Sequence, residues 1–530
     1  MILPWLIAIP ILGGLLALVA DRVHPSGPRW VALLALGANL ALSVFLWAGF
    51  GVLSLAEARS PWLAEYRAAW IPNFGISFHL AVDGLSLLLV VLTAFLGAMA
   101  VLASWREVRE RAGLFHFNVL WVLAGISGVF LAVDLFLFAF FWELMLVPTY
   151  FLFFWGRGRR LAAAIKIFIF TQAGGLLMLL SIIGLALLQA AGTGAITFDY
   201  ADLLRSPAGG ATAFWLMLGF FVAFAVKLPV VPLHTWLPDA YATAPTGATV
   251  ILAGLMAKTG GYGLLRFVVP LFPEAALAFA PVAMALAVAS ILYGAGLAFA
   301  QTDLKRLVAY SSLSHMGFVM LGAFAWNEWA LQGAVMVMIA HGISVGALFI
   351  LAGALQERLQ TSALDRMGGL WATAPRLGGA MLFFALGTLG LPGLGNFVGE
   401  FLTLLGSFAA NATLAVVAVL GIVLATVYAL WMLQSRPIRP PDGRDGPVGQ
   451  RTFQGPNEHR WRIPDLSARE AFVAAALVAA LLWLGLFPQP VLDTAGQAIA
   501  NLQRSAGAQV VAEPAAPAVD GASLLRGVGR

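Results

Sequence analysis

The chain has 530 residues, of which 61% are hydrophobic and only 10% are charged, and its formal net charge is +5. A soluble domain carries about 25% charged residues, so the composition excludes a soluble globular protein and indicates an integral membrane protein. Cysteine is absent, which excludes thiolate metal sites, iron–sulfur clusters and disulfides within the chain. The positive charges are spread over many connections, so nucleic-acid binding has no support.

Hydropathy predicts an all-α polytopic membrane protein with about fourteen transmembrane helices, since each crossing needs about 20 apolar residues. The apolar–polar alternation of a β-barrel is missing. The first stretch, "MILPWLIAIPILGGLLALVA", lacks a basic region and a cleavage site, so we expect a retained helix. The predicted spans cover residues 2–20, 30–50, 78–103, 114–132, 134–155, 161–190, 211–240, 247–269, 276–299, 304–324, 329–355, 377–409, 412–434 and 469–488.

Basic residues are distributed unevenly between the connections. Most of them lie in the odd-numbered connections, counted from the one between the first and second spans. The even-numbered connections hold only Arg59, Arg67 and Arg205. The positive-inside rule therefore predicts that the odd-numbered connections are cytoplasmic and that both termini are on the opposite, periplasmic side.

Two predicted spans contain residues that break helices. The stretch "AVKLPVVPLHTWLPDA" (225–240) has three prolines, and "LGLPGLGNFVGEF" (389–401) has Pro392 and several glycines before Glu400. Such breaks persist in a membrane only where they are buried in protein or line a wet cavity. Two breaks in corresponding halves of the chain indicate an internal repeat with a transport site.

The end of the chain is more polar. Residues 435–468 are expected to form an exposed cytoplasmic loop, followed by a last helix at 469–488. The tail, 489–530, is expected to be disordered because of its composition.

Ionisable residues lie deep in several predicted spans. Glu143, in "FFWELMLVP", Lys227, Lys258 and Glu400 each cost roughly 2.5–3.5 kcal/mol in a bilayer. We interpret them as a proton wire, because desolvation disfavours the ionised form and a nearby opposite charge restores it. Glu143 beside Lys227 would then form a switchable pair. Histidine titrates near neutrality and suits relay positions, and three histidines fall in or near spans: His234, His315 and His341.

Structural roles are the alternative for each of these residues. One Glu–Lys pair could lock helices together, and a buried His often satisfies an interhelical hydrogen bond. Asp83 is expected to cap a helix, and Lys166 and Arg266 are expected to snorkel from span ends.

No nucleotide-binding motif of the form GxxxxGK[ST] or GxGxxG occurs in the chain. Moving one charge against 100 mV takes about 2.3 kcal/mol. The chain must therefore take its energy from an ion gradient or from a partner subunit.

Four long stretches carry a resemblance to a known family. They are "FLAVDLFLFAFFWELMLVPTYFL", "FAVKLPVVPLHTWLPDAYATAPTGATVILAGLMAKTGGYGLLRF", "FAQTDLKRLVAYSSLSHMGFV" and "GLPGLGNFVGEFLTLLGSF". They resemble the antiporter-like membrane subunits of respiratory complex I, the proton-pumping NADH:quinone oxidoreductase, and their Mrp-type antiporter relatives. The resemblance extends from Met1 to about Asn501 and implies fourteen helices with two inverted five-helix repeats and two broken helices. Helices 1–3 would occupy 1–113, the first repeat (helices 4–8) 114–270 and the second (helices 9–13) 271–434.

The resemblance also implies roles for the buried residues. Glu143 and Lys227 match the coupling pair, Lys258 the central relay, and Glu400 the terminal site. His234, His315 and His341 match relay or water-organising positions.

The resemblance further implies partners and a location. The chain would hold no cofactor or metal, while NADH, FMN, iron–sulfur clusters and quinone would bind to partner subunits. Its neighbours would be the antiporter-like L and N subunits and lipids, in a bacterial inner membrane.

Glu400 distinguishes branches of this family, and two further features depart from the family pattern. Antiporter and L or N relatives generally carry Lys at the position of Glu400, so Glu400 favours the subunit M branch. Tyr241 stands where many relatives have His, and residues 435–450 look like an insertion.

Three functions remain open from the sequence. The first is a redox-driven proton-pumping subunit, and the second is a cation/proton antiporter subunit without a link to electron transfer. The third is a membrane scaffold with fortuitous buried charges, in which neutralising Glu143 would change assembly but not transport.

Overall fold

Long helices make up most of the chain in the computed structural model, which describes all residues except 1, 54–60, 206–209, 434–462 and 506–530. Thirteen helical segments in the described part are long and apolar enough to cross a membrane. The span predicted at 377–409 is instead two shorter helices. The predicted insertion at 435–450 lies outside the described residues.

The helices before the first break are numbered in chain order. They are α1 (Leu3–Val23), α2 (Gly27–Leu53), α3 (Gly84–Ala103), α4 (Ala112–Leu131), α5 (Leu135–Leu144), α6 (Leu146–Leu152), α7 (Arg160–Thr193), α8 (Tyr200–Arg205) and α9 (Gly210–Lys227). The central helices are α10 (Leu237–Thr243), α11 (Thr246–Ile251), α12 (Ala257–Gly263) and α13 (Val269–Leu271). The remaining helices are α14 (Pro273–Phe299), α15 (Leu304–Ala325), α16 (Glu328–Leu359), α17 (Leu370–Thr373), α18 (Pro375–Thr388), α19 (Gly395–Ala410), α20 (Ala412–Leu433), α21 (Ala468–Leu486) and α22 (Gln489–Ser505).

Short 3-10 turns lie at 72–74, 153–155 and 364–366. Two π-helical turns, Leu252–Met256 and Leu264–Val268, flank α12, so α11 to α13 form one continuous span, Thr246–Leu271. A π-turn widens the helix and frees backbone groups, and such turns are frequent at functional sites.

The two predicted breaks are present. Helix α9 ends at Lys227, and a stretch of turns separates it from α10. Helix α18 ends at Thr388, and α19 begins at Gly395. The prolines and glycines between these helices remove hydrogen-bond donors or take positive φ angles, as Gly390 and Gly393 do.

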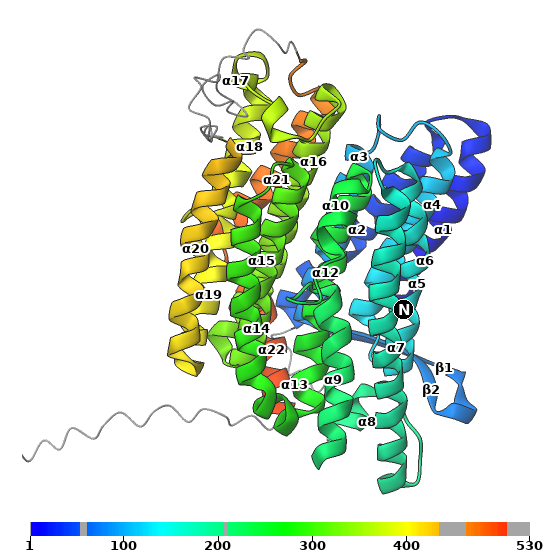
Figure 1. Cartoon of the computed structure of the whole chain (residues 1–530). Coiled ribbons are helices and arrows are strands. Elements are labelled where there is room, and N and C mark those ends of the chain that lie inside the picture. Colours follow the sequence, from blue (N-terminus) through cyan, green and yellow to red (C-terminus); the bar gives the residue numbers. More distant parts are fainter. Residues whose placement is uncertain (1, 54–60, 206–209, 434–462, 506–530) are drawn as a thin grey trace, which may run out of the picture.

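The two ends of the bundle differ. The short helix α17 lies at one end, and the β-hairpin, α8 and α22 lie at the other (Figure 1). At the α17 end, arginines tie neighbouring segments together: Arg29 donates to the Val108 carbonyl at 2.7 Å, and Arg469 of α21 donates to the Leu102 carbonyl of α3 at 2.8 Å. We call this the basic end and the opposite one the hairpin end.

Two elements at the hairpin end differ from the sequence-based expectations. Strands β1 (Ala64–Ile71) and β2 (Ile76–Val82) form an antiparallel hairpin, where the all-α prediction had no strand. The predicted disorder from residue 489 is wrong for Gln489–Ser505, which form the amphipathic helix α22. Its apolar residues pack against α3 and α16, while its polar residues face outward, and this pattern misled a reading based on average composition.

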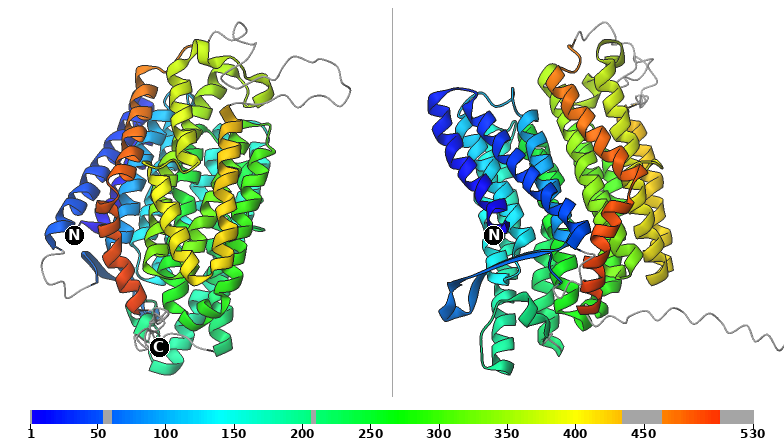
Figure 2. Two further views of the ribbon diagram at one scale, coloured as in Figure 1. Left: turned by 90° about the vertical axis from the view of Figure 1, so that its left-hand side faces the viewer. Right: turned by 180° about the vertical axis from the view of Figure 1, so that it is seen from behind.

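The most buried helices surround the central charges. The spans of α11–α13, α15 and α16 are almost entirely enclosed, whereas α2, α20 and α21 expose apolar side chains outward. Figure 2 shows α20 and α21 on the outside of the bundle. Exposed apolar faces of this extent are suited to contact with lipid or with a neighbouring membrane protein.

Candidate functional site

Glu143 lies near the end of α5, on a half-buried face of the bundle. Its side chain is hydrogen-bonded to Gln172 of α7 and is within electrostatic reach of Lys227. Gly175 of α7 makes room for the carboxylate, because a Cβ atom there would lie 2.1 Å from Glu143 Oε1. The carboxylate therefore sits where α7 has no side chain.

Lys227 occupies the last position of α9, where the helix breaks. It is 1% exposed, and its Nζ atom has no hydrogen-bond partner in the described part of the chain. The Nζ atom instead lies 4.9 Å from the ring centre of Trp142, a favourable cation–π position. Glu143 and Lys227 thus interact through space, with the indole of Trp142 beside the lysine, and are not joined by a direct hydrogen bond.

Lys258 lies in α12, directly after the first π-turn. Its Nζ donates to the carbonyl of Ala253 at 2.6 Å and contacts His341 Nδ1 of α16 at 2.8 Å. Ala253 lies five residues earlier, inside the π-turn, where the regular helical ladder is interrupted. The widened helix therefore supplies a carbonyl acceptor for the buried ammonium.

A row of polar side chains continues from Lys258. The rings of His341 and His315 are 5.5 Å apart, and His315 Nδ1 lies 2.7 Å from Glu400 Oε1. Tyr428 of α20 lies 3.0 Å from His315 Nε2. Four helices, α12, α16, α15 and α19, thus bring Lys258, His341, His315 and Glu400 into one buried series.

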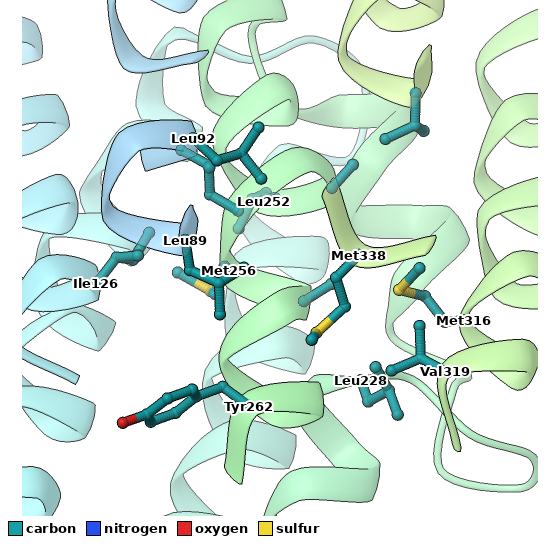
Figure 3. Close-up of a cluster of buried hydrophobic side chains, with 14 of the residues drawn as sticks. Leu89, Leu92, Ile126, Leu228, Leu252, Met256, Tyr262, Met316, Val319 and Met338 are labelled. Atoms are coloured by element: carbon teal, nitrogen blue, oxygen red, sulfur yellow. The ribbon is translucent and has the colours of Figure 1, made fainter. Parts of the chain in front are cut away.

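Apolar side chains pack against α12 at Gly261, three residues after Lys258. Leu228, Val319 and Met338 converge on Gly261, where a Cβ atom would be 3.5, 3.0 and 2.7 Å from their nearest atoms. Figure 3 shows Leu228, Val319, Met316 and Met338 grouped on one side of the Lys258 helix. We call these four residues the apolar layer. Because Leu228 directly follows Lys227, the layer begins beside the broken helix.

His234 lies within the first break, and Tyr241 lies in α10, just after it. His234 is buried, its ring is 5.5 Å from that of Tyr293, and its Nδ1 atom has no partner among the described residues. The structure does not join His234 to the Lys258 series. The Tyr241 hydroxyl donates to the Leu252 carbonyl of the π-turn at 3.2 Å.

The two span-end cations predicted to snorkel both form ion pairs. Arg266 is 2% exposed and donates to Asp83 Oδ2 at 2.5 Å. Asp83 also caps α3, as the sequence predicted, by accepting from the Ser86 backbone amide at 3.0 Å. Lys166 pairs with Asp239 at 2.8 Å and remains partly exposed.

A second histidine cluster lies outside the spans, on the hairpin. His79 Nδ1 is 2.7 Å from Asp199 Oδ2, and its Nε2 is 2.8 Å from Glu65 Oε1. Burial acts to lower the pKa of His79, but the hydrogen bonds and negative charges of the two carboxylates raise it above its usual 6.5. The pairing therefore ties β1 and β2 to the segment before α8.

Sequence reasoning missed Gln172, Tyr428 and the His79 cluster. The polar residue Gln172 inside an apolar span was a visible signal, as was Tyr428 in the otherwise apolar α20. The partners of His79 are 14 and 120 positions away along the chain, and no local pattern indicates such contacts.

The chain is similar to known proteins over nearly its whole length. Residues 132–425 match the family described as NADH:quinone oxidoreductase/Mrp antiporter, TM. NADH-quinone oxidoreductase subunit M of Pseudomonas aeruginosa is 51% identical over 517 residues, covering 96% of this chain and 98% of the relative. The protein of the same name from Escherichia coli K12 is 50% identical over 511 residues, covering 95% and 98%.

A solved structure has the same fold. A chain of respiratory complex I from Thermus thermophilus with bound NADH matches with a TM-score of 0.80 and 32% identity, covering 95% of this chain and 99% of that one. The chain therefore belongs to the NADH-quinone oxidoreductase subunit M family, within the wider group of NADH:quinone oxidoreductase and Mrp antiporter membrane proteins.

Proposed function

We propose that this chain is a proton-translocating membrane subunit of respiratory complex I, in which buried charges couple electron transfer elsewhere in the complex to proton movement. The observation that carries the proposal is the buried series Lys258–His341–His315–Glu400, with a second Lys–Glu arrangement at the first break. Ionisable groups in a bilayer are costly and mark proton or ion pathways.

Lys227 supports a switching role. Its ammonium has no hydrogen-bond partner among the described residues. The charge of Glu143 and the ring of Trp142 are the groups that stabilise its positive charge. A change in the position or protonation of Glu143 would alter the proton affinity of Lys227, because the lysine has little other compensation for its burial.

The Lys258 series supports proton transfer over a distance. Each imidazole accepts a proton at one nitrogen and releases one from the other. A proton on Lys258 would pass to His341, then to His315, and leave through Glu400. The apolar layer would keep Lys227 and Lys258 out of contact until water enters between them.

The remaining parts of the assignment follow from the proposed assembly. We place the basic end in the cytoplasm of a bacterial cell and the hairpin end in the periplasm. The antiporter-like L and N subunits would be its neighbours, and NADH, FMN, iron–sulfur clusters and quinone would bind to other subunits.

The test uses inverted membrane vesicles that contain the assembled complex. NADH-driven quinone reduction and vesicle acidification are measured together for wild type and Glu143→Gln, with assembly checked by native electrophoresis. Glu274→Gln, at an exposed position of α14, is the matched control.

We expect Glu143→Gln to assemble and to lose both activities, while Glu274→Gln keeps them. Wild-type rates in an assembled Glu143→Gln complex would refute the switching role. Loss of assembly alone, with normal transport per assembled complex, would favour a structural scaffold.

A further inference from the structure

Lys305 is a buried lysine that the proposed mechanism does not use. It lies in the first turn of α15, at the basic end, and is 2% exposed. Its ammonium makes no hydrogen bond or ion pair among the described residues, and its Nζ atom, unlike that of Lys227, is not among the fully enclosed polar atoms without a partner, so it keeps some accessible surface at the basic end. The charges that act on it come from Glu107, Arg157 and Asp303, two acids and one base.

Glu107 is itself engaged elsewhere. It follows α3, and its Oε2 accepts from the Thr246 backbone amide at 2.9 Å, at the start of the span that carries Lys258. Glu107 and Thr246 also line a small, partly open pocket of about 20 Å³, which has room for one water molecule. Lys305 does not line this pocket, but it is within electrostatic reach of Glu107, which does.

The same helix leads from Lys305 to the buried series. Ser312 is seven residues further and His315 ten, so the three side chains share one face of α15. Ser312 is fully buried, and its hydroxyl has no partner among the described residues. Its neighbour Ser311 is also buried but donates to the Val308 carbonyl at 2.8 Å. A free hydroxyl between two titratable groups is the arrangement that a proton path needs.

We propose that Lys305 takes up protons at the basic end and that Ser312, with water on either side, passes them to His315. The distance along the helix is about 15 Å, at 1.5 Å per residue. In each transfer the acceptor oxygen binds one proton and releases another, so one proton moves without a change in bonding. This inference rests on the proposed function, because His315 must already belong to the pumping series.

The experiment compares Lys305→Arg and Lys305→Met in vesicles of the assembled complex. Arginine keeps the positive charge but does not release its proton in proteins, so it separates a structural charge from a proton carrier. Ser312→Ala is tested beside the matched control Ser311→Ala. Lys258→Met is measured in parallel as a test of the proposed function itself.

We expect both Lys305 variants to assemble and to lose proton pumping by roughly 10²-fold, the lower end of what a positioned proton-transfer group contributes. Ser312→Ala should slow pumping, while Ser311→Ala should not. If Lys305→Met fails to assemble, the pumping rates of Lys305→Arg and Ser312→Ala still test the proposed path.

Wild-type pumping by Lys305→Arg would overturn the uptake role and leave Lys305 a structural charge. Equal rates for Ser311→Ala and Ser312→Ala would remove Ser312 from the path. Normal pumping by Lys258→Met would instead refute the proposed function. If Lys258→Met loses pumping while Lys305→Arg pumps normally, the uptake role of Lys305 alone is refuted.

Discussion

The Nζ atom of Lys258 and the Nδ1 atom of His341 lie 2.8 Å apart, with both side chains buried and supplied by different helices. The second acceptor of the ammonium is the Ala253 carbonyl of the π-turn. The contact between α12 and α16 therefore joins the central lysine to the imidazole that leads to His315.

The first prediction concerns His341. Asn at this position places an amide atom near the site of Nδ1 and so preserves a polar contact to Lys258, but it cannot carry a proton onward. We expect His341→Asn to assemble and to lose pumping by roughly 10²-fold. Acidification assays on assembled complex measure the loss, with the exposed His24→Asn as control. Normal pumping would show that the series does not run through His341.

The second prediction uses the space at Gly175. A methyl group there would come within 2.1 Å of Glu143 Oε1, so Gly175→Ala must push the carboxylate away without removing its charge. We expect reduced pumping in an assembled complex. Gly192→Ala, on the same helix with nothing within 4 Å of its Cβ position, is the matched control. Equal activity of the two variants would mean that the position of Glu143 does not matter.

The third prediction concerns the buried pair of Asp83 and Arg266. Removing one partner of such a pair costs about 3–5 kcal/mol, because the other charge stays buried and unpaired. Asp83→Ala also removes the cap of α3, so we expect poor assembly and a lower Tm. Asp83→Leu combined with Arg266→Met should recover part of the stability, because no unpaired charge remains. Thermal unfolding of purified complex provides the measurement, and a double variant no more stable than the single one would contradict the explanation.

The fourth prediction is a pH dependence at the hairpin. The pKa of His79 is raised above 6.5, so its contribution to stability is complete below pH 6.5 and is lost as the pH rises through the raised value. Burial acts to raise the pKa of Asp199, but the contacts of the carboxylate with His79 and Arg67 lower this pKa below 3.8. The contribution of Asp199 to stability is therefore lost only as the pH falls below 3.8.

The hairpin should therefore be held most firmly in mildly acidic solution. Hydrogen exchange of residues 64–82, corrected for the intrinsic pH effect, should show protection falling above pH 6.5 in the wild type. His79→Gln should remove this dependence. An unchanged pH profile in that variant would assign the effect to other groups.

The helical membrane fold was predictable because its signals are local in the sequence. Apolar runs indicate the spans, and prolines and glycines indicate the breaks. Glu143, Lys227, Lys258 and Glu400 stood out because a charge inside an apolar run is visible without coordinates. The pairing of Arg266 with Asp83 was not predictable in this way, since the partners are 183 positions apart. The π-turns beside Lys258 also have no sequence signature of their own, because they depend on how α11 to α13 pack against α16.

Helix α22 limits how the whole molecule is able to move. It contacts both α3 and α16, and a Cβ atom at Gly84 would be only 1.7 Å from the Thr494 carbonyl oxygen, so the helix is seated closely on α3. Gln503 reaches the Trp326 carbonyl at 3.2 Å, beyond the end of α15. A rocking motion that separated α3 from α16 at this end would have to break the contacts of α22 with one of them. Transport through this chain is therefore better served by small side-chain rotations and transient wetting than by alternating access of rigid bodies.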